Sequence, residues 1–206
     1  FMKKAKIYKI LKKFHGGGIG MSVISCINER RSIRSYKDEP ISEKIINELL
    51  ELGTKAATGS AMEPWGFVVI QDREELNKLS DEIKKHLIAN FDKFPYLKQY
   101  KNWVENPKYN VFYDAGTLVI IYGNTDSHWN IYDCSLVAGN IMLGAYEMGI
   151  GSCWIGFGEY IFNTKEFKEK YGVPENFQGI CPLTLGYMKI KPKPPVRKAP
   201  VIFNKR

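Results

Sequence analysis

The order of hydrophobic and polar positions along this chain predicts a mixture of helices and strands. Capping residues followed by apolar residues at helical spacing predict helices over residues 22–30, 40–50, 72–90, 130–148 and 164–171. Short apolar runs predict strands over residues 66–71, 116–123, 150–155 and 179–187. The chain shows no internal repeat and no sign of a second domain, so we predict one domain over residues 21–206.

Both ends of the chain depart from this pattern. Residues 3–14 have the periodicity of a short cationic amphipathic helix, and the glycine-rich residues 16–20 separate it from the domain. This helix could anchor the protein to an anionic membrane surface, or it could be a solvated or non-native extension before Met21. We favour the extension, because one short helix binds membranes only marginally. From about residue 188 the chain is rich in proline and lysine, which predicts an extended arm crossing a surface.

A long insertion with weak periodicity lies between two of the predicted elements. Its aromatic residues are Phe91, Phe94, Tyr96, Tyr100, Trp103, Tyr109, Phe112 and Tyr113. Such a segment predicts a lid or a binding wall, whose aromatic side chains could stack on an aromatic substrate or equally cover a dimer interface. The predicted helix over residues 130–148 is apolar around most of its circumference, which is typical of a central helix or of a subunit interface.

Composition and charge exclude several classes of protein. With 44% hydrophobic and 25% charged residues the chain is an ordinary globular protein, and its apolar runs are too short to cross a membrane. The net charge of +8 comes mainly from six lysines in residues 1–20, since the other residues include 24 basic and 22 acidic side chains. A nearly neutral body argues against a nucleic-acid partner. Four scattered cysteines and no recognisable signal peptide predict buried thiols and a cytoplasmic location.

Familiar catalytic motifs are missing from the sequence. It has no HExxH, GxSxG or GxxxxGK[ST] motif, and its glycine pairs fail the GxGxxG spacing. The three histidines, His15, His86 and His128, are too scattered for a metal site, and we expect them to be surface side chains. If the protein is an enzyme, its reactive centre is therefore not expected to be a side chain.

The segment Arg30-Arg31-Ser32-Ile33-Arg34-Ser35-Tyr36 carries the densest chemical signal. Three guanidinium groups beside two serine hydroxyls suit a dianionic phosphate, through bidentate and charge-assisted hydrogen bonds. A solvated basic turn is the alternative interpretation. Because Ile33 lies among the charges, we expect the segment to be partly packed and predict phosphate recognition.

Four motifs in order resemble the nitroreductase family of flavoproteins, over roughly residues 22 to 200. They are the arginine segment, residues 56–69 with Pro64-Trp65, residues 149–157, and Leu185-Gly186-Tyr187 followed by Pro195-Val196-Arg197-Lys198. The resemblance implies an α+β fold with a central, mainly antiparallel sheet flanked by helices. It also implies an intertwined homodimer that binds FMN at the subunit interface.

The same resemblance implies which residues bind the flavin. Those holding the phosphate, the ribityl chain and the pyrimidine edge would be Arg30, Arg31, Ser32, Arg34, Arg197 and Lys198. Ser60 and Met62 would come from the partner subunit. Gly156 and Phe157 would lie against the ring, with a backbone N–H aimed at flavin N5. No side chain is expected to be catalytic, because the flavin is the reactive group.

Particular residues near these motifs carry narrower expectations. Family members commonly have Asn and Gln where this chain has Ala61 and Glu63, so an amide contact to the flavin would be lost. Glu63 would either oppose negative charge on the reduced flavin, which a guanidinium such as Arg34 would stabilise, or pair with an arginine. We expect Trp65 and Trp154 in the core and Cys153 as an inert thiol.

The function implied is an FMN-dependent oxidoreductase without a metal. It would take hydride from NAD(P)H and reduce electron-poor small molecules, such as nitroaromatics or quinones, by a ping-pong mechanism. The alternatives are specialised flavin chemistry on the same fold, namely dehalogenation or flavin fragmentation, and flavin binding without turnover. The physiological substrate and the choice between NADH and NADPH do not follow from the sequence.

Overall fold

The computed structural model describes residues 21–93 and 95–204. The predicted helix over residues 3–14 and the aromatic residue Phe94 lie outside the described residues. The predicted helices and strands between residues 22 and 187 are all present, with most ends within about two residues of the prediction. After Met188, which forms an isolated bridge with Tyr36, the described chain has no further helix or strand, as expected for an extended arm.

Four antiparallel strands form the central sheet, in the order β1-β2-β4-β3. They are β1 (Trp65–Ile70), β2 (Thr117–Asn124), β3 (Ile150–Trp154) and β4 (Phe177–Tyr187). The expected central, mainly antiparallel sheet is therefore confirmed. Seven of the eight residues of β2 are buried, which explains why its sequence is a continuous apolar run rather than an alternating one.

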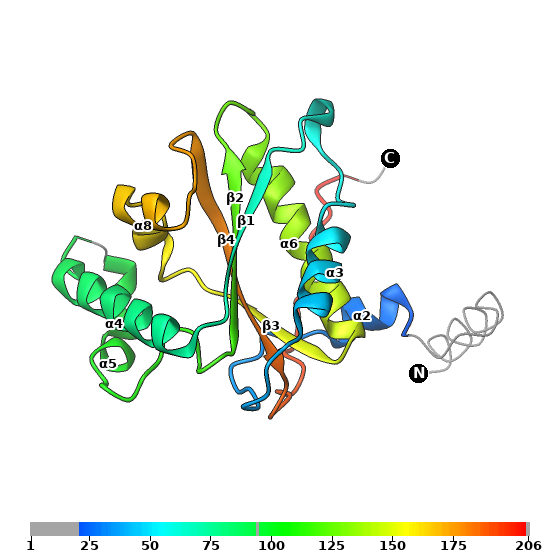
Figure 1. Ribbon diagram of the computed structural model, residues 1–206. Coiled ribbons are helices and arrows are strands. Elements are labelled where there is room, and N and C mark those ends of the chain that lie inside the picture. The colour runs from blue at the N-terminus through cyan, green and yellow to red at the C-terminus, as the bar shows by residue number, and fades with distance from the viewer. Residues whose placement is uncertain (1–20, 94, 205–206) are drawn as a thin grey trace.

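Helices cover both faces of the sheet (Figure 1). One layer contains α3 (Glu43–Gly53) and α6 (Asn130–Glu147), with α2 (Val23–Glu29) against α6. The other contains α4 (Arg73–Asn90), η2 (Pro95–Tyr100), α5 (Lys101–Val104), α7 (Glu159–Phe162) and α8 (Lys165–Lys170). Successive residues of β2 point to opposite layers: Leu118 and Ile120 join the α4 core, while Val119 and Ile121 join the α6 core.

The arginine segment leaves α2 and runs beside the sheet at β3. Ser32 bridges Ser152 of β3, and the Ile33 N–H donates to the Ser152 carbonyl at 2.9 Å. The side chain of Ile33 is fully buried, which confirms that the segment is packed. Gly151 makes this approach possible, since a Cβ on Gly151 would lie 2.7 Å from Cγ1 of Ile33. The backbone between the arginines is therefore tied to the core.

Replacing Gly151 by alanine should separate the arginine segment from β3. The added methyl group meets Ile33 and Met188 within 2.8 Å, so the packed neighbours have to shift. We expect a loss of about 1–3 kcal/mol in the free energy of unfolding, measured by urea denaturation. Gly116→Ala is the matched control, because a Cβ there meets nothing within 4 Å. Equal stability of Gly151→Ala and the control would contradict this packing.

Candidate functional site

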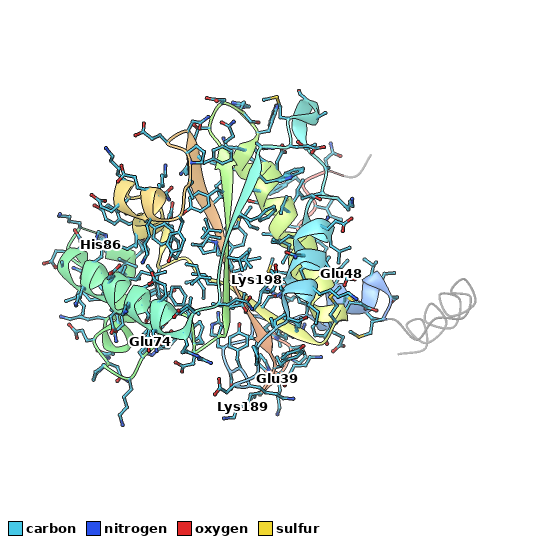
Figure 2. All side chains as sticks on the ribbon, viewed as in Figure 1. Glu39, Glu48, Glu74, His86, Lys189 and Lys198 are labelled. Carbon is cyan, nitrogen blue, oxygen red and sulfur yellow. The ribbon has the colours of Figure 1, made fainter. Side chains whose placement is uncertain are left out.

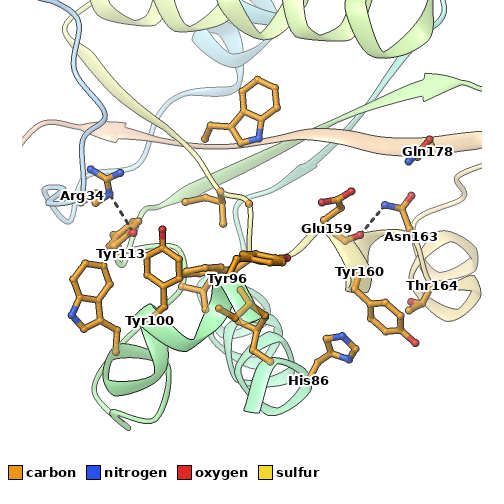
Figure 3. A pocket seen from close by; sticks show the side chains of 18 residues that line it. Arg34, His86, Tyr96, Tyr100, Tyr113, Glu159, Tyr160, Asn163, Thr164 and Gln178 are labelled. Atoms are coloured by element: carbon orange, nitrogen blue, oxygen red, sulfur yellow. Dashed lines mark hydrogen bonds between the residues drawn. The ribbon is translucent and has the colours of Figure 1, made fainter. Parts of the chain in front are cut away.

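A cleft of about 1180 Å³ opens on the α4 side of the sheet, where β3 ends. Its walls are largely aromatic, and the aromatic lining residues are His86, Tyr96, Tyr100, Trp103, Tyr113, Trp154, Phe157 and Tyr160. Arg34 enters from one side, and Glu159 and Asn163 lie across the cleft from it (Figure 3). Such a concave, mostly apolar site with a few polar groups is typical of a pocket for a flat organic molecule.

The floor of the cleft continues directly from β3. The Ile155 N–H donates to the Pro182 carbonyl at 2.9 Å, which extends the pairing with β4 by one residue. At Gly156 the chain leaves the sheet, and a Cβ there would meet nothing within 4 Å. Phe157 is held by Tyr100, whose ring packs edge-on with centroids 5.1 Å apart. The main chain at Gly156 is therefore accessible from an open, aromatic space.

A tyrosine from the aromatic insertion holds Arg34 at the rim of the cleft. The Arg34 Nε donates to the Tyr113 hydroxyl at 3.2 Å, and the guanidinium lies 5.6 Å from the centre of the Tyr113 ring. Tyr113 and the next residue, Asp114, both have a φ of 56°. Left-handed backbone at two consecutive non-glycine residues is unfavourable and often marks a functional site.

Positive side chains from both ends of the domain converge beside β3. Burial lowers the pKa of the Arg30 guanidinium, and the charges of Arg31 and Arg197 lower this pKa further. Arg197 is thus close to Arg30, although it lies on the C-terminal arm. Among residues 21–93 and 95–204, no ion pair involves Arg30, Arg31, Arg34, Arg197 or Lys198. Their positive charges are therefore not neutralised by carboxylates of this chain.

Arg31 is held differently from its neighbours. Its Nη1 donates to the carbonyls of Asn28 and Arg30, each at 2.7 Å, and so closes the end of α2. Its Nε is buried without a hydrogen-bond partner. Figure 2 shows Lys198 near the lower half of the sheet and His86 on the far side of the α4 layer. Arg31 therefore also has a structural role, which the sequence pattern did not reveal.

Cys153 lies between the arginines and the cleft. Burial raises the pKa of its thiol, and Arg34, Ser32 and Arg30 lower it by less. The thiol therefore stays largely protonated at neutral pH, in agreement with an inert role. All four cysteines are buried and free, as predicted, and the described part of the chain has no cluster of three or more candidate metal ligands.

The structure does not bring Ser60 and Met62 to this cleft. Both lie at η1 (Gly59–Ala61) or directly after it, and both are exposed. The loop leads into Trp65, which pairs with Gly123 at one end of the sheet. The strand β3 pairs with residues 183–187 of β4, toward the other end. Two residues of the predicted flavin set are thus separated from the rest within one chain.

Several side chains near the cleft differ from expectation. Trp154 is 41% exposed and lines the cleft, so its predicted place in the core is wrong, whereas Trp65 does pack against the α6 core. His86, expected at the surface, is partly buried and stacks on Tyr160 with ring centroids 3.8 Å apart. Glu63 is exposed and joins no ion pair of the described residues, so a pairing with arginine is not seen.

The polar end of the cleft was missed at the sequence level. Glu159 and Asn163 belong to the short helix α7 and its C-cap, and Gln178 comes from β4. A helix of four residues has no readable apolar period, so no local pattern could have marked these side chains. In the described residues no helix has the length and apolar content needed to cross a membrane.

Comparisons with known proteins agree with this architecture. The family model described as "Nitroreductase family" matches residues 27–187. A protein of Archaeoglobus fulgidus with the provisional name NADH dehydrogenase/NAD(P)H nitroreductase is 31% identical over 168 residues, covering 81% of this chain and 85% of its own. The crystal structure of a Bacteroides fragilis nitroreductase with bound FMN covers 90% of this chain and all of its own, at 29% identity and a TM-score of 0.79.

A more distant structure shares only the fold. It is iodotyrosine deiodinase bound to FMN and 3-iodo-L-tyrosine, at 17% identity and a TM-score of 0.74, covering 89% of this chain and all of its own. The predicted α+β fold of the nitroreductase type is therefore confirmed. Since the family match includes the arginine segment, the whole sheet and the floor of the cleft, this chain belongs to the nitroreductase family.

Proposed function

We propose that this protein is an FMN-dependent oxidoreductase that takes hydride from NAD(P)H and reduces electron-poor aromatic or quinone acceptors. One observation carries the proposal: unpaired positive side chains from both ends of the domain converge next to an open aromatic cleft. A planar ring system with a dianionic phosphate is complementary to both parts of this arrangement. FMN is such a molecule, and it is present in the Bacteroides fragilis structure.

The residues present fit this cofactor. Arg30 and Arg197 repel one another, as the lowered pKa of Arg30 shows, and a phosphate between them would remove the repulsion. The accessible main chain at Gly156 leaves room for a ring with a polar edge. No carboxylate of the described chain competes for these cations in an ion pair.

Each part of the site would have a separate task. Arg30, Arg197 and Lys198 would bind the phosphate, with Ser32 toward the ribityl chain, and Arg31 would contribute its charge while closing α2. Arg34, fixed by Tyr113, would face the pyrimidine edge, where a positive charge favours reduction. Gly156 would donate its N–H and Phe157 would support the ring. When bound, FMN would supply the redox chemistry by accepting a hydride and passing two electrons to the acceptor.

The exposed apolar surface supports a homodimer. Apolar side chains at least 49% exposed occur on α2 and on one face of α6: Val23, Ile24, Ile27, Ile131, Tyr132 and Leu136. On the C-terminal arm Val196 and Phe203 are almost fully exposed. Contiguous apolar surface of this kind marks an interface. A partner bound there would bring its Ser60 and Met62 toward this chain's cleft and complete a site that one chain leaves open.

The aromatic wall favours an aromatic or quinone acceptor over an aliphatic one. Tyr96, Tyr100 and Trp103 face the space beside Gly156 and offer stacking surfaces. Nicotinamide and acceptor would take turns in this space, which is the basis for ping-pong kinetics. We propose the aromatic insertion as a substrate wall rather than as a cover of the dimer, because its residues line the cleft.

The test is an anaerobic titration of the purified protein with FMN, NADH and NADPH. We expect a yellow protein that bleaches with a nicotinamide and recovers its colour with a nitroaromatic or a quinone. A protein that remains colourless with added FMN would overturn the proposal. Bleaching without transfer to any acceptor would indicate flavin storage, and turnover confined to halogenated aromatics would indicate dehalogenation.

A further inference from the structure

The loop before β1 is held in an unfavourable backbone conformation. Ser60, Ala61 and Glu63 have φ values of 53°, 52° and 46°, so three of four consecutive residues are left-handed without being glycine. Side chains with a Cβ rarely adopt this conformation, because the Cβ approaches the following carbonyl oxygen. Such strain persists only where surrounding contacts enforce it, and it concentrates at functional sites.

A buried carboxylate enforces the shape of this loop. Asp133, in the first turn of α6, is 4% exposed. Its Oδ2 accepts from the Thr58 hydroxyl at 2.9 Å and from the Gly59 N–H at 3.0 Å. The Thr58 Oγ1 accepts in turn from the Glu63 N–H at 3.0 Å. Asp133 and Thr58 together therefore fasten the loop at both ends of its left-handed stretch.

Packing against α6 tightens the same loop. A Cβ on Gly59 would lie 2.4 Å from Cδ1 of Trp129, so the indole lies directly against the Gly59 backbone. Yet the loop itself contributes nothing to the core, since Ser60, Ala61 and Met62 are all exposed. The strain is thus imposed on residues whose side chains face solvent in the single chain.

We propose that Asp133, acting through Thr58, is a positioning residue that presets loop 58–63 to receive the flavin bound by the partner subunit. This inference rests on the proposed function, which assigns Ser60 and Met62 to the partner's flavin. A loop already held in its binding conformation loses less conformational freedom when the ligand arrives. Charge-assisted hydrogen bonds to a buried carboxylate are strong enough to maintain the strained backbone.

Two pairs of variants separate positioning from folding. Thr58→Val removes the hydroxyl at nearly constant volume, while Thr58→Ser keeps it. Asp133→Asn removes the charge that receives the Thr58 and Gly59 donors, and Asp126→Asn is its control. Asp126 also accepts a hydrogen bond, from Asn176 Nδ2 at 2.9 Å, but it has no bond to the loop.

The measurements are FMN affinity by fluorescence titration, amide hydrogen exchange of the apoprotein and the thermal midpoint. We expect Thr58→Val and Asp133→Asn to weaken FMN binding about tenfold and to speed exchange at Gly59 and Glu63. Thr58→Ser and Asp126→Asn should match the wild type, and the thermal midpoint of Thr58→Val should stay close to it.

Each result decides the inference. If Thr58→Val binds FMN as tightly as Thr58→Ser, positioning through Thr58 is overturned, and this pair also decides should Asp133→Asn fail to fold. If the wild type does not bind FMN, the proposed function fails and the positioning role fails with it, although faster exchange in Thr58→Val would still establish the loop network. If the wild type binds and all variants match it, only this inference fails.

Discussion

Alanine at Arg30 or at Arg197 is expected to weaken FMN binding about ten- to hundredfold, because each substitution removes a charge-assisted contact to the phosphate. The two side chains come from opposite ends of the domain and lower the stability of each other's charge. A phosphate placed between them would be stabilised by both. The measurement is a titration of the apoprotein that follows the quenching of flavin fluorescence.

Riboflavin makes this prediction specific to the phosphate. It has the ring and the ribityl chain of FMN but no phosphate, so its affinity should change little in either variant. Arg73→Ala is the matched control, since Arg73 is paired with Asp38 at 2.7 Å and does not line the cleft. Equal losses for riboflavin and FMN would show that the arginines do not contact the phosphate.

Valine at Gly156 is expected to abolish most of the FMN affinity while leaving the fold intact. A Cβ at Gly156 meets nothing within 4 Å, so the single chain tolerates the larger side chain. The space that valine fills is the space proposed for the flavin ring. Overlap with a bound ring should lower the affinity by about ten- to hundredfold, judged from the cost of forcing extra methyl groups into a packed site.

Gly116→Val separates this effect from a general effect of valine. Gly116 has the same open surroundings and lies outside the cleft. Thermal midpoints of both variants should remain near the wild type, and only Gly156→Val should lose flavin in a titration with FMN or riboflavin. A Gly156→Val protein that keeps wild-type affinity would place the ring elsewhere.

Local sequence patterns predicted the elements well because each element has its own signal. Ser22, Ser42 and Asp72 accept hydrogen bonds from the third residue that follows, as capping residues should, and their helices begin at the predicted places. The buried strands β2 and β4 were readable as apolar runs. Where an element is short, as in α7, no period exists and the prediction failed.

The candidate site could be predicted only in part. The arginine segment and the Gly156 floor were predicted from motifs and lie close together, as their link through Cys153 shows. The exposed position of Trp154, the stacking of His86 on Tyr160 and the role of Arg31 in closing α2 were not predicted. Each of these depends on which element packs beside the residue, and that is not encoded in its immediate neighbours.

By itself the sequence determined the order of helices and strands, the family and the phosphate-like chemistry of the segment beginning at Arg30, because these depend on local period, capping and motif. Only the tertiary structure decided that Arg197 returns to Arg30, that the aromatic insertion walls the cleft, and that Ser60 and Met62 lie toward the other end of the sheet. Such juxtapositions arise from long-range packing around the sheet, in which residues distant in sequence are brought together by burying both of its faces.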